Sequence, residues 1–191
     1  MGKQIKNREV LLIASGPKAA EYRHEIEEFI KKKKPFVIAT NTNICINKKL
    51  VNIFVASNPL KLIADSNSYK SLIAPLVVPK SLLSNDIKTK FRKTKLLDFG
   101  VGVKENCFEF HKTGAVMPKL YNLSYALAIA TSGNASRILL AGFDGYGSNH
   151  KRTKKLDELF YLYSSFKGTK SITAITPTSY SIFSNSIYTL A

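Results

Sequence analysis

The fold is decided at residues 9–17, which read EVLLIASGP. A short, continuous apolar run such as 9–14 is typical of a strand buried in a parallel sheet, and the glycine and proline that follow it predict a turn. Residues 19–34 then place apolar side chains on one face at helical spacing, with glutamates early and four lysines at the end, an order that suits the helix dipole. Because Pro35 stops this helix, the opening residues predict a strand–loop–helix unit.

The same alternation continues along the chain. Further strands are expected at 36–40, 51–56, 75–78, 96–103, 137–141 and 171–175. Helices are expected at 59–69, 81–93, 121–131 and 151–166, while 105–111 is a second edge strand or a loop. Strands that alternate with helices predict an α/β fold, here one Rossmann-like domain over residues 1–191 with a mostly parallel sheet covered by helices on both faces. That the chain is a fragment of a longer protein stays an open alternative.

Composition excludes several classes of protein. A chain of 191 residues that is 45% hydrophobic suits one globular domain rather than a disordered or fibrous protein. We expect no membrane helix, because no apolar run approaches the roughly 18–20 residues that such a helix needs. The polar first ten residues do not resemble a signal peptide, so a cytoplasmic location is expected. Cys45 and Cys107 are expected to be reduced thiols, and their spacing to histidines suggests no zinc site.

The strongest signal in the composition is positive charge. Lys and Arg number 29 against 13 Asp and Glu, a net charge of +16. Such a field attracts nucleic acid, anionic lipid headgroups or phosphorylated substrates, although a lysine-rich genome would give the same composition. The lysine clusters lack the interleaved aromatic residues of a strand-binding groove, so nucleic acid is not an expected partner. Peripheral contact with the anionic inner face of a membrane is an expected interaction.

Five predicted strands end in small, amide, hydroxyl or glycine residues. These strand ends are 15–17, 41–43, 57–59, 142–146 and 176–179. Ligands bind at this edge of an open parallel sheet, where phosphate needs close backbone approach and free N–H groups, and where amides and hydroxyls can pair with a base and a ribose. The alternative is a set of ordinary turns. We predict a nucleotide site that contains Ser15, Gly16, Pro17, Asn41, Asn43, Ser57, Asn58 and Gly142.

Two further residues near this edge are candidates for catalysis. Asp144 is the only carboxylate at these strand ends, where it orients a substrate hydroxyl, joins a metal site or caps the following turn. His150 lies just beyond it, and histidine is the side chain best suited to act as a general base near neutral pH. The alternative is an inert exposed histidine. The first loop carries neither a dinucleotide fingerprint nor a P-loop. One aspartate makes a poor metal site, so no metal and no resident cofactor is predicted.

These motifs together resemble the bacterial sialyltransferases, which use CMP-sialic acid. The resemblance runs from residue 10 to about residue 188 and rests on 13–17 (IASGP), Asn41, 57–59 (SNP) and 138–144 (ILLAGFD). It implies that the first three motifs hold the CMP, that Asp144 orients the substrate and that His150 deprotonates the acceptor. Where the family opens an alanine-rich helix with Ser-Gly, this chain has Tyr121-Asn122, so Asn122 or Ser124 would take that place in nucleotide binding.

A closer resemblance is to the C-terminal module of aldolase-like proteins from surface-polysaccharide gene clusters, which carries the turn AGFDGY at 141–146 almost unchanged. The sialyltransferases have a lid between the Asp turn and the His, and here only residues 145–149 lie between them. The two resemblances imply a glycosyltransferase-like domain that binds a CMP-activated acidic sugar in bacterial surface-glycan synthesis.

Two alternatives belong to other classes. One is a pyrophosphokinase similar to the archaeal pterin-type enzymes, which would need ATP and magnesium. The other is a non-catalytic nucleotide-binding or docking module for an aldolase partner, which the missing lid favours.

Overall fold

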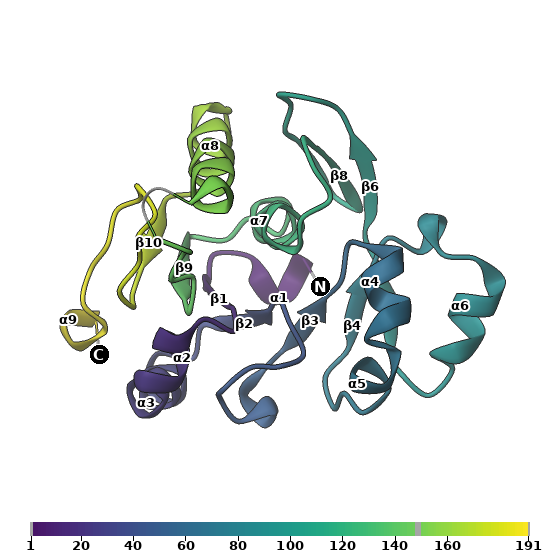
Figure 1. Cartoon of the computed structure of the whole chain (residues 1–191), viewed down its shortest axis with the longest axis horizontal. Coiled ribbons are helices and arrows are strands. Elements are labelled where there is room, and N and C mark those ends of the chain that lie inside the picture. The colour runs from purple at the N-terminus through teal and green to yellow at the C-terminus, as the bar shows by residue number, and fades with distance from the viewer. Residues whose placement is uncertain (1, 148–149, 191) are drawn as a thin grey trace.

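The computed structural model describes residues 2–147 and 150–190 and has one large sheet at its centre (Figure 1). In spatial order its seven strands are β10 (Ile172–Ala174), β9 (Arg137–Ala141), β1 (Glu9–Ile13), β2 (Phe36–Ala39), β3 (Ile53–Val55), β4 (Leu76–Val78) and β5 (Leu96–Asp98). All neighbouring pairs are parallel. The predicted Rossmann-like domain with a parallel sheet is therefore confirmed.

Both faces of this sheet are buried, which explains the continuous apolar run in β1. Val10 and Leu12 belong to one hydrophobic core, whereas Leu11 and Ile13 belong to the other, and none of the four is exposed. Successive side chains of a strand point to opposite faces, so a strand covered on both sides needs an apolar residue at every position.

The helices divide between the two faces (Figure 1). The first core contains residues of α1 (Gly2–Ile5), α7 (Asn122–Ser132) and α8 (Lys151–Ser165). The second contains residues of α2 (Pro17–Glu21), α3 (Arg23–Lys33), α4 (Pro59–Ala64), α5 (Ser66–Lys70) and α9 (Ile187–Leu190). The remaining helical segments are the two three-residue pieces η1 (Lys48–Leu50) and η2 (Lys80–Leu82) and the helix α6 (Asn85–Lys90). Within the described ranges, no helix combines the length and the apolar character that crossing a bilayer requires.

Two predicted helices are each split in the structure. The helix expected at 19–34 begins at Pro17 and breaks at Tyr22, and the one expected at 59–69 breaks at Asp65. At both breaks ψ moves only to about +20° (23° and 18°), a change too local to disturb the spacing of apolar residues along the sequence. The spacing of apolar residues alone therefore could not predict these two helix breaks.

The strand predicted at 96–103 is two strands that belong to different sheets. The backbone N–H of buried Phe99 still bonds to Val78 of the large sheet, at 3.2 Å, whereas that of Gly100 bonds to Thr113, at 2.8 Å. From there β6 (Gly100–Val103) joins a three-stranded sheet with β8 (Gly114–Met117) and β7 (Glu109–His111), in the order β6-β8-β7. A Cβ on Gly114 would lie 3.1 Å from the carbonyl carbon of Gly100, so this crossing needs glycine.

The small sheet explains why α7 is apolar on nearly all sides. Nine of its residues, Leu123 to Thr131, are buried. The large sheet lies on one side of α7, and Ala115 and Met117 of β8 pack into the same core from the other. A helix enclosed in this way has no solvent face to carry polar residues. α7 begins at the edge of the sheet where strands β2 and β3 end, which places its first turn beside the candidate site.

Candidate functional site

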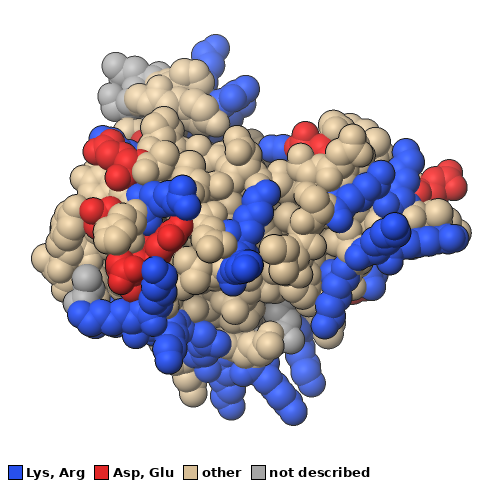
Figure 2. Space-filling view, turned by 90° about the horizontal axis from the view of Figure 1, so that it is seen from below, with Lys and Arg blue, Asp and Glu red and all other residues tan. Residues whose placement is uncertain are grey.

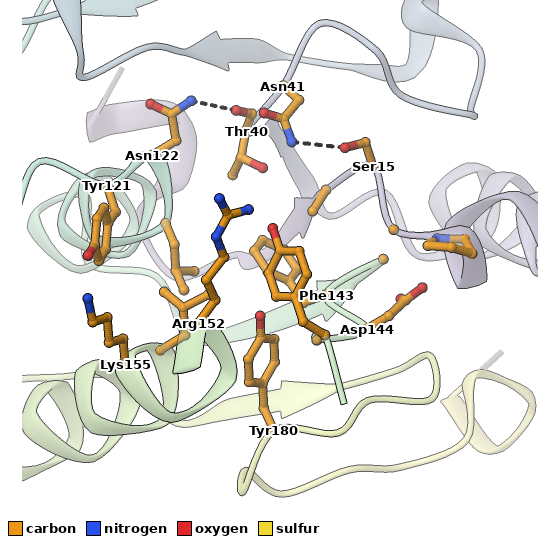
Figure 3. A pocket seen from close by; sticks show the side chains of 18 of the residues that line it. Ser15, Thr40, Asn41, Tyr121, Asn122, Phe143, Asp144, Arg152, Lys155 and Tyr180 are labelled. Carbon is orange, nitrogen blue, oxygen red and sulfur yellow. Dashed lines mark hydrogen bonds between the residues drawn. The ribbon is translucent and has the colours of Figure 1, made fainter. Parts of the chain in front are cut away.

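The candidate site lies where the strand order reverses. From β1 the chain builds β2 to β5 on one side, and later returns to place β9 and β10 on the other. Beyond the carboxyl ends of β1 and β9 is a cleft of about 740 Å³ (Figure 3). Ligands of open α/β sheets bind at such a reversal point, and the volume lies within the range usual for small-molecule sites.

One wall of the cleft carries the predicted hydroxyl and amide residues. Ser15, Asn41, Asn58 and Asn122 all line it, together with Thr40. The amide of Asn41 donates to the Ser15 hydroxyl at 3.2 Å, so the ends of β1 and β2 are tied together (Figure 3). The structure therefore brings together polar residues from loops that are distant in the sequence.

Asn122 uses its side chain mainly to join strand ends. Its amide nitrogen donates to the Thr40 carbonyl at 2.7 Å, and its oxygen accepts from both the backbone N–H and the hydroxyl of Ser57, each at 3.0 Å. Asn58 similarly caps α4, since its oxygen accepts from Leu60 N–H at 2.9 Å. These contacts leave the Asn41 oxygen and the Asn58 amide nitrogen as the groups of this wall best placed to meet a ligand.

The glycines of the cleft allow two loops to pack closely. A Cβ on Gly16 would lie 2.6 Å from Cγ of Asp144, and one on Gly142, whose φ is +73°, would lie 2.6 Å from Cβ of Ala19. Gly16 N–H also donates to the Gly142 carbonyl at 3.0 Å. The predicted glycine positions thus lie at the cleft, but the contact that each requires is with the neighbouring loop.

Asp144 joins the β9 loop to the start of α2. One carboxylate oxygen accepts from Lys18 N–H at 2.6 Å, and Pro17, the residue before it, has no N–H to offer. The Lys18 N–H at the start of α2 is therefore already bonded to this carboxylate and is not free to bind a phosphate. Its side chain points toward α2 rather than toward Arg152 (Figure 3). Its second oxygen is buried without a partner among the described residues, and burial raises the pKa of this carboxyl group despite the Lys18 hydrogen bond.

The opposite wall is cationic, which the sequence did not predict. Arg152 and Lys155 extend from the first turns of α8 into the cleft (Figure 3). Lys61 of α4 is a third cation that lines it. Within residues 2–147 and 150–190 none of the three forms an ion pair with a carboxylate. Two sequence signals could have found them: Arg152 and Lys155 are three residues apart at the start of the helix after β9, and Lys61 follows Asn58 by three.

Tyr121, Tyr146 and Tyr180 complete the cleft, and were also missed. The Arg152 guanidinium lies 5.4 Å from the centre of the Tyr146 ring. Burial is the main cause that raises the pKa of Tyr180 to about 12, so its hydroxyl remains a hydrogen-bond donor at neutral pH. Aromatic faces beside cations suit a ligand that has both planar and charged parts.

His150 lies beside the cleft but is not among the residues that line it. It is the N-cap of α8, where Nδ1 accepts the Arg152 N–H at 3.1 Å, and its ring stacks on Tyr146 with centroids 5.2 Å apart. A neutral imidazole that accepts at Nδ1 carries its hydrogen on Nε2. To accept a proton, His150 must therefore first release the Arg152 N–H. The loop between the Asp turn and this residue includes 148–149, which lie outside the described residues.

The remaining predicted residues line the cleft, lie buried beside it or are exposed away from it. Gly16 and Pro17 line the cleft, whereas Ser57 is buried behind it on Asn122. Ser124 is buried at the start of α7, where its hydroxyl donates to the Lys119 carbonyl at 2.6 Å. Asn43 is exposed and does not line the cleft.

The donor set of the cleft favours an anionic organic ligand. Three cations line the cleft together with amide and hydroxyl groups, and its one carboxylate is engaged by a backbone N–H. Across residues 2–147 and 150–190 no three His, Cys, Asp or Glu residues gather as a metal site would require.

No protein-family model matches this chain, and a search of curated proteins finds no match either.

Proposed function

We propose that this protein is a glycosyltransferase-like domain that binds a CMP-activated acidic sugar for bacterial surface-glycan synthesis. The observation that carries the proposal is one cleft, at the reversal of strand order, that amide and hydroxyl groups line together with three cations. None of these cations pairs with a carboxylate of the described residues. The choice of CMP and of an acidic sugar follows from the sequence resemblance to sialyltransferases.

The two walls would bind different parts of the donor. Ser15, Asn41 and Asn58 offer the directional donors and acceptors that a base and a ribose need. Arg152 and Lys155 would bind the phosphate and the sugar carboxylate, because hydrogen bonds between ionised partners are shorter and stronger than neutral ones. Lys61 adds charge without requiring a fixed geometry.

Transfer requires a base for the acceptor hydroxyl, and we assign that role to His150. The acceptor oxygen bonds to the anomeric carbon as the bond from that carbon to the phosphate oxygen breaks. CMP leaves with the bonding electron pair, and the hydroxyl proton passes to Nδ1 of His150. That nitrogen releases the Arg152 N–H to accept it, which costs the helix one capping bond. Asp144 remains a positioning residue that fixes the two loops.

A thermal-shift titration with CMP, CDP, UMP, ADP and ATP, with and without magnesium, tests the proposal. A ligand that binds only the folded protein stabilises it by about 2.7 kcal/mol at a hundredfold excess over Kd. We expect metal-independent stabilisation by CMP or CDP. Stabilisation by ATP only with magnesium would support the pyrophosphokinase instead. No shift with any nucleotide would remove the nucleotide site and favour the docking module.

A further inference from the structure

A second, smaller cavity lies directly beside the nucleotide cleft. It measures about 300 Å³ and lies between α8 and the loops that flank the small sheet. Its lining residues are Asn106, Pro118, Lys119, Tyr121, Lys155, Glu158, Leu159, Tyr161 and Leu162. Tyr121 and Lys155 also line the cleft, so the two cavities share a wall. A molecule held here would contact two side chains that also line the cleft.

The chemistry of this cavity differs from that of the cleft. Glu158 brings a carboxylate next to Lys119 and Lys155, so the lining carries both signs of charge and does not select a polyanion. Asn106 and Glu158 form no side-chain hydrogen bond to other described residues, which leaves an amide and a carboxylate available to hydroxyl groups. The set fits a ligand with many hydroxyls.

Tyr161 supplies an aromatic face at the same place. It lies on α8, is 81% exposed and lines the second cavity, so its ring is free to meet a ligand there. The C–H face of a pyranose ring is apolar, while its edge carries hydroxyls. An exposed aromatic ring that lines the same cavity as Asn106 and Glu158 therefore matches both parts of a sugar.

We propose that this second cavity binds the acceptor saccharide, with Tyr161 stacking on a sugar ring and with Glu158 and Asn106 binding its hydroxyls. The assignment as acceptor rests on the proposed function, because it is the shared wall of Tyr121 and Lys155 that would bring an acceptor next to the donor. Saccharide binding by the cavity itself does not depend on what fills the cleft.

An oligosaccharide array tests the proposal. The biotinylated protein is assembled on labelled streptavidin so that avidity reveals weak binding. We expect wild type to bind a subset of saccharides, and Tyr161→Ala and Glu158→Gln each to lose most of that signal. Phe183→Ala is the matched control, because Phe183 is also an exposed aromatic residue (70%) but lines neither cavity. The array signal of this control should equal that of wild type.

A parallel titration with CMP separates the two proposals. Tyr161→Ala and Glu158→Gln should leave the Kd for CMP unchanged. Absence of saccharide binding by wild type, or a signal that neither variant reduces, overturns the second cavity even if CMP binds. Failure of CMP to bind overturns the proposed function, while a saccharide signal that depends on Tyr161 and Glu158 would still establish the second cavity as a sugar site.

Discussion

Gly16 shows how closely the loops beneath the cleft are packed. A Cβ there would lie 2.6 Å from the Asp144 carboxyl carbon and 2.4 Å from the backbone oxygen of Gly142. Gly16→Ala should therefore force the β1 and β9 loops apart and lower the free energy of unfolding by about 1–3 kcal/mol. Thermal unfolding measures the change. Gly2→Ala is the control, since nothing lies within 4 Å of its added methyl, and an equal loss there would refute this account.

Asp144 gives the fold a component of stability that depends on pH. Burial raises the pKa of this carboxyl group in the folded state, so the folded protein holds the proton more tightly than the unfolded chain. Its contribution is thus largest below the ordinary carboxyl pKa and is lost as the pH rises through the folded pKa.

Asp144→Asn should remove this dependence, because an amide oxygen can still accept the Lys18 N–H but does not titrate. Urea unfolding from about pH 3.5 to about pH 7 should show a smaller fall in stability for the variant than for wild type. Parallel curves for the two proteins would mean that Asp144 does not titrate differently in the fold.

At the scale of an element, the first turns of α8 hold both the N-cap of the helix and residues proposed to act in the cleft. His150 caps this helix, and Arg152 and Lys155 of its first turns reach the cleft. His150→Ala should lower stability by about 1 kcal/mol, whereas His150→Asn, a better cap, should not. Both should abolish transfer while leaving the affinity for CMP intact. Activity that survives in His150→Asn would limit His150 to capping.

Elements whose residues are fixed by burial could be predicted from the sequence, whereas elements fixed by pairing with distant strands could not. β1 and β9 are buried on both faces, so their continuous apolar runs were sufficient to predict them as strands. β5 and β6 read as one strand, because the change of sheet at Phe99 depends on tertiary pairing with Val78 and Thr113. β8 was missed, since its short run forms a strand only through its pairing with β6 and β7. The residues that pair with β5, β6 and β8 lie elsewhere in the chain, so the local sequence cannot reveal them.

The candidate site shows the same limit. Ser15, Asn41 and Asn58 could be predicted because every parallel strand ends at the same edge. The cationic wall could not, because Arg152 and Lys155 enter the cleft only through the way α8 packs on the sheet. Gly16 lines the cleft, but the sequence could not show that Asp144, 128 residues away, requires a glycine there.

At the scale of the whole molecule, positive charge is spread well beyond the cleft. Figure 2 shows Lys and Arg side chains along the lower edge and the right of the face seen from below, whereas most of its acidic side chains gather at the left. The lysines at the end of α3 and those of α6 are part of the net charge of +16. Lysines near an anionic leaflet contribute about 1 kcal/mol each and are screened by salt.

We therefore expect the protein to sediment with vesicles that contain phosphatidylserine and not with neutral phosphatidylcholine vesicles. Binding should be lost at about 0.5 M salt, where the Debye length is shorter than the reach of a surface lysine. Equal binding to both vesicle types would contradict an electrostatic attachment.

The most direct test of the proposed function is the Kd for CMP measured by calorimetry in wild type and in two double variants. Arg152→Gln with Lys155→Gln removes two charges from the cleft, and Lys151→Gln with Lys154→Gln removes two from the same helix outside it. We predict CMP binding by wild type, a Kd that rises about tenfold or more in the first variant, and little change in the second. An equal Kd in all three proteins, or no binding by wild type, would contradict a nucleotide site in this cleft.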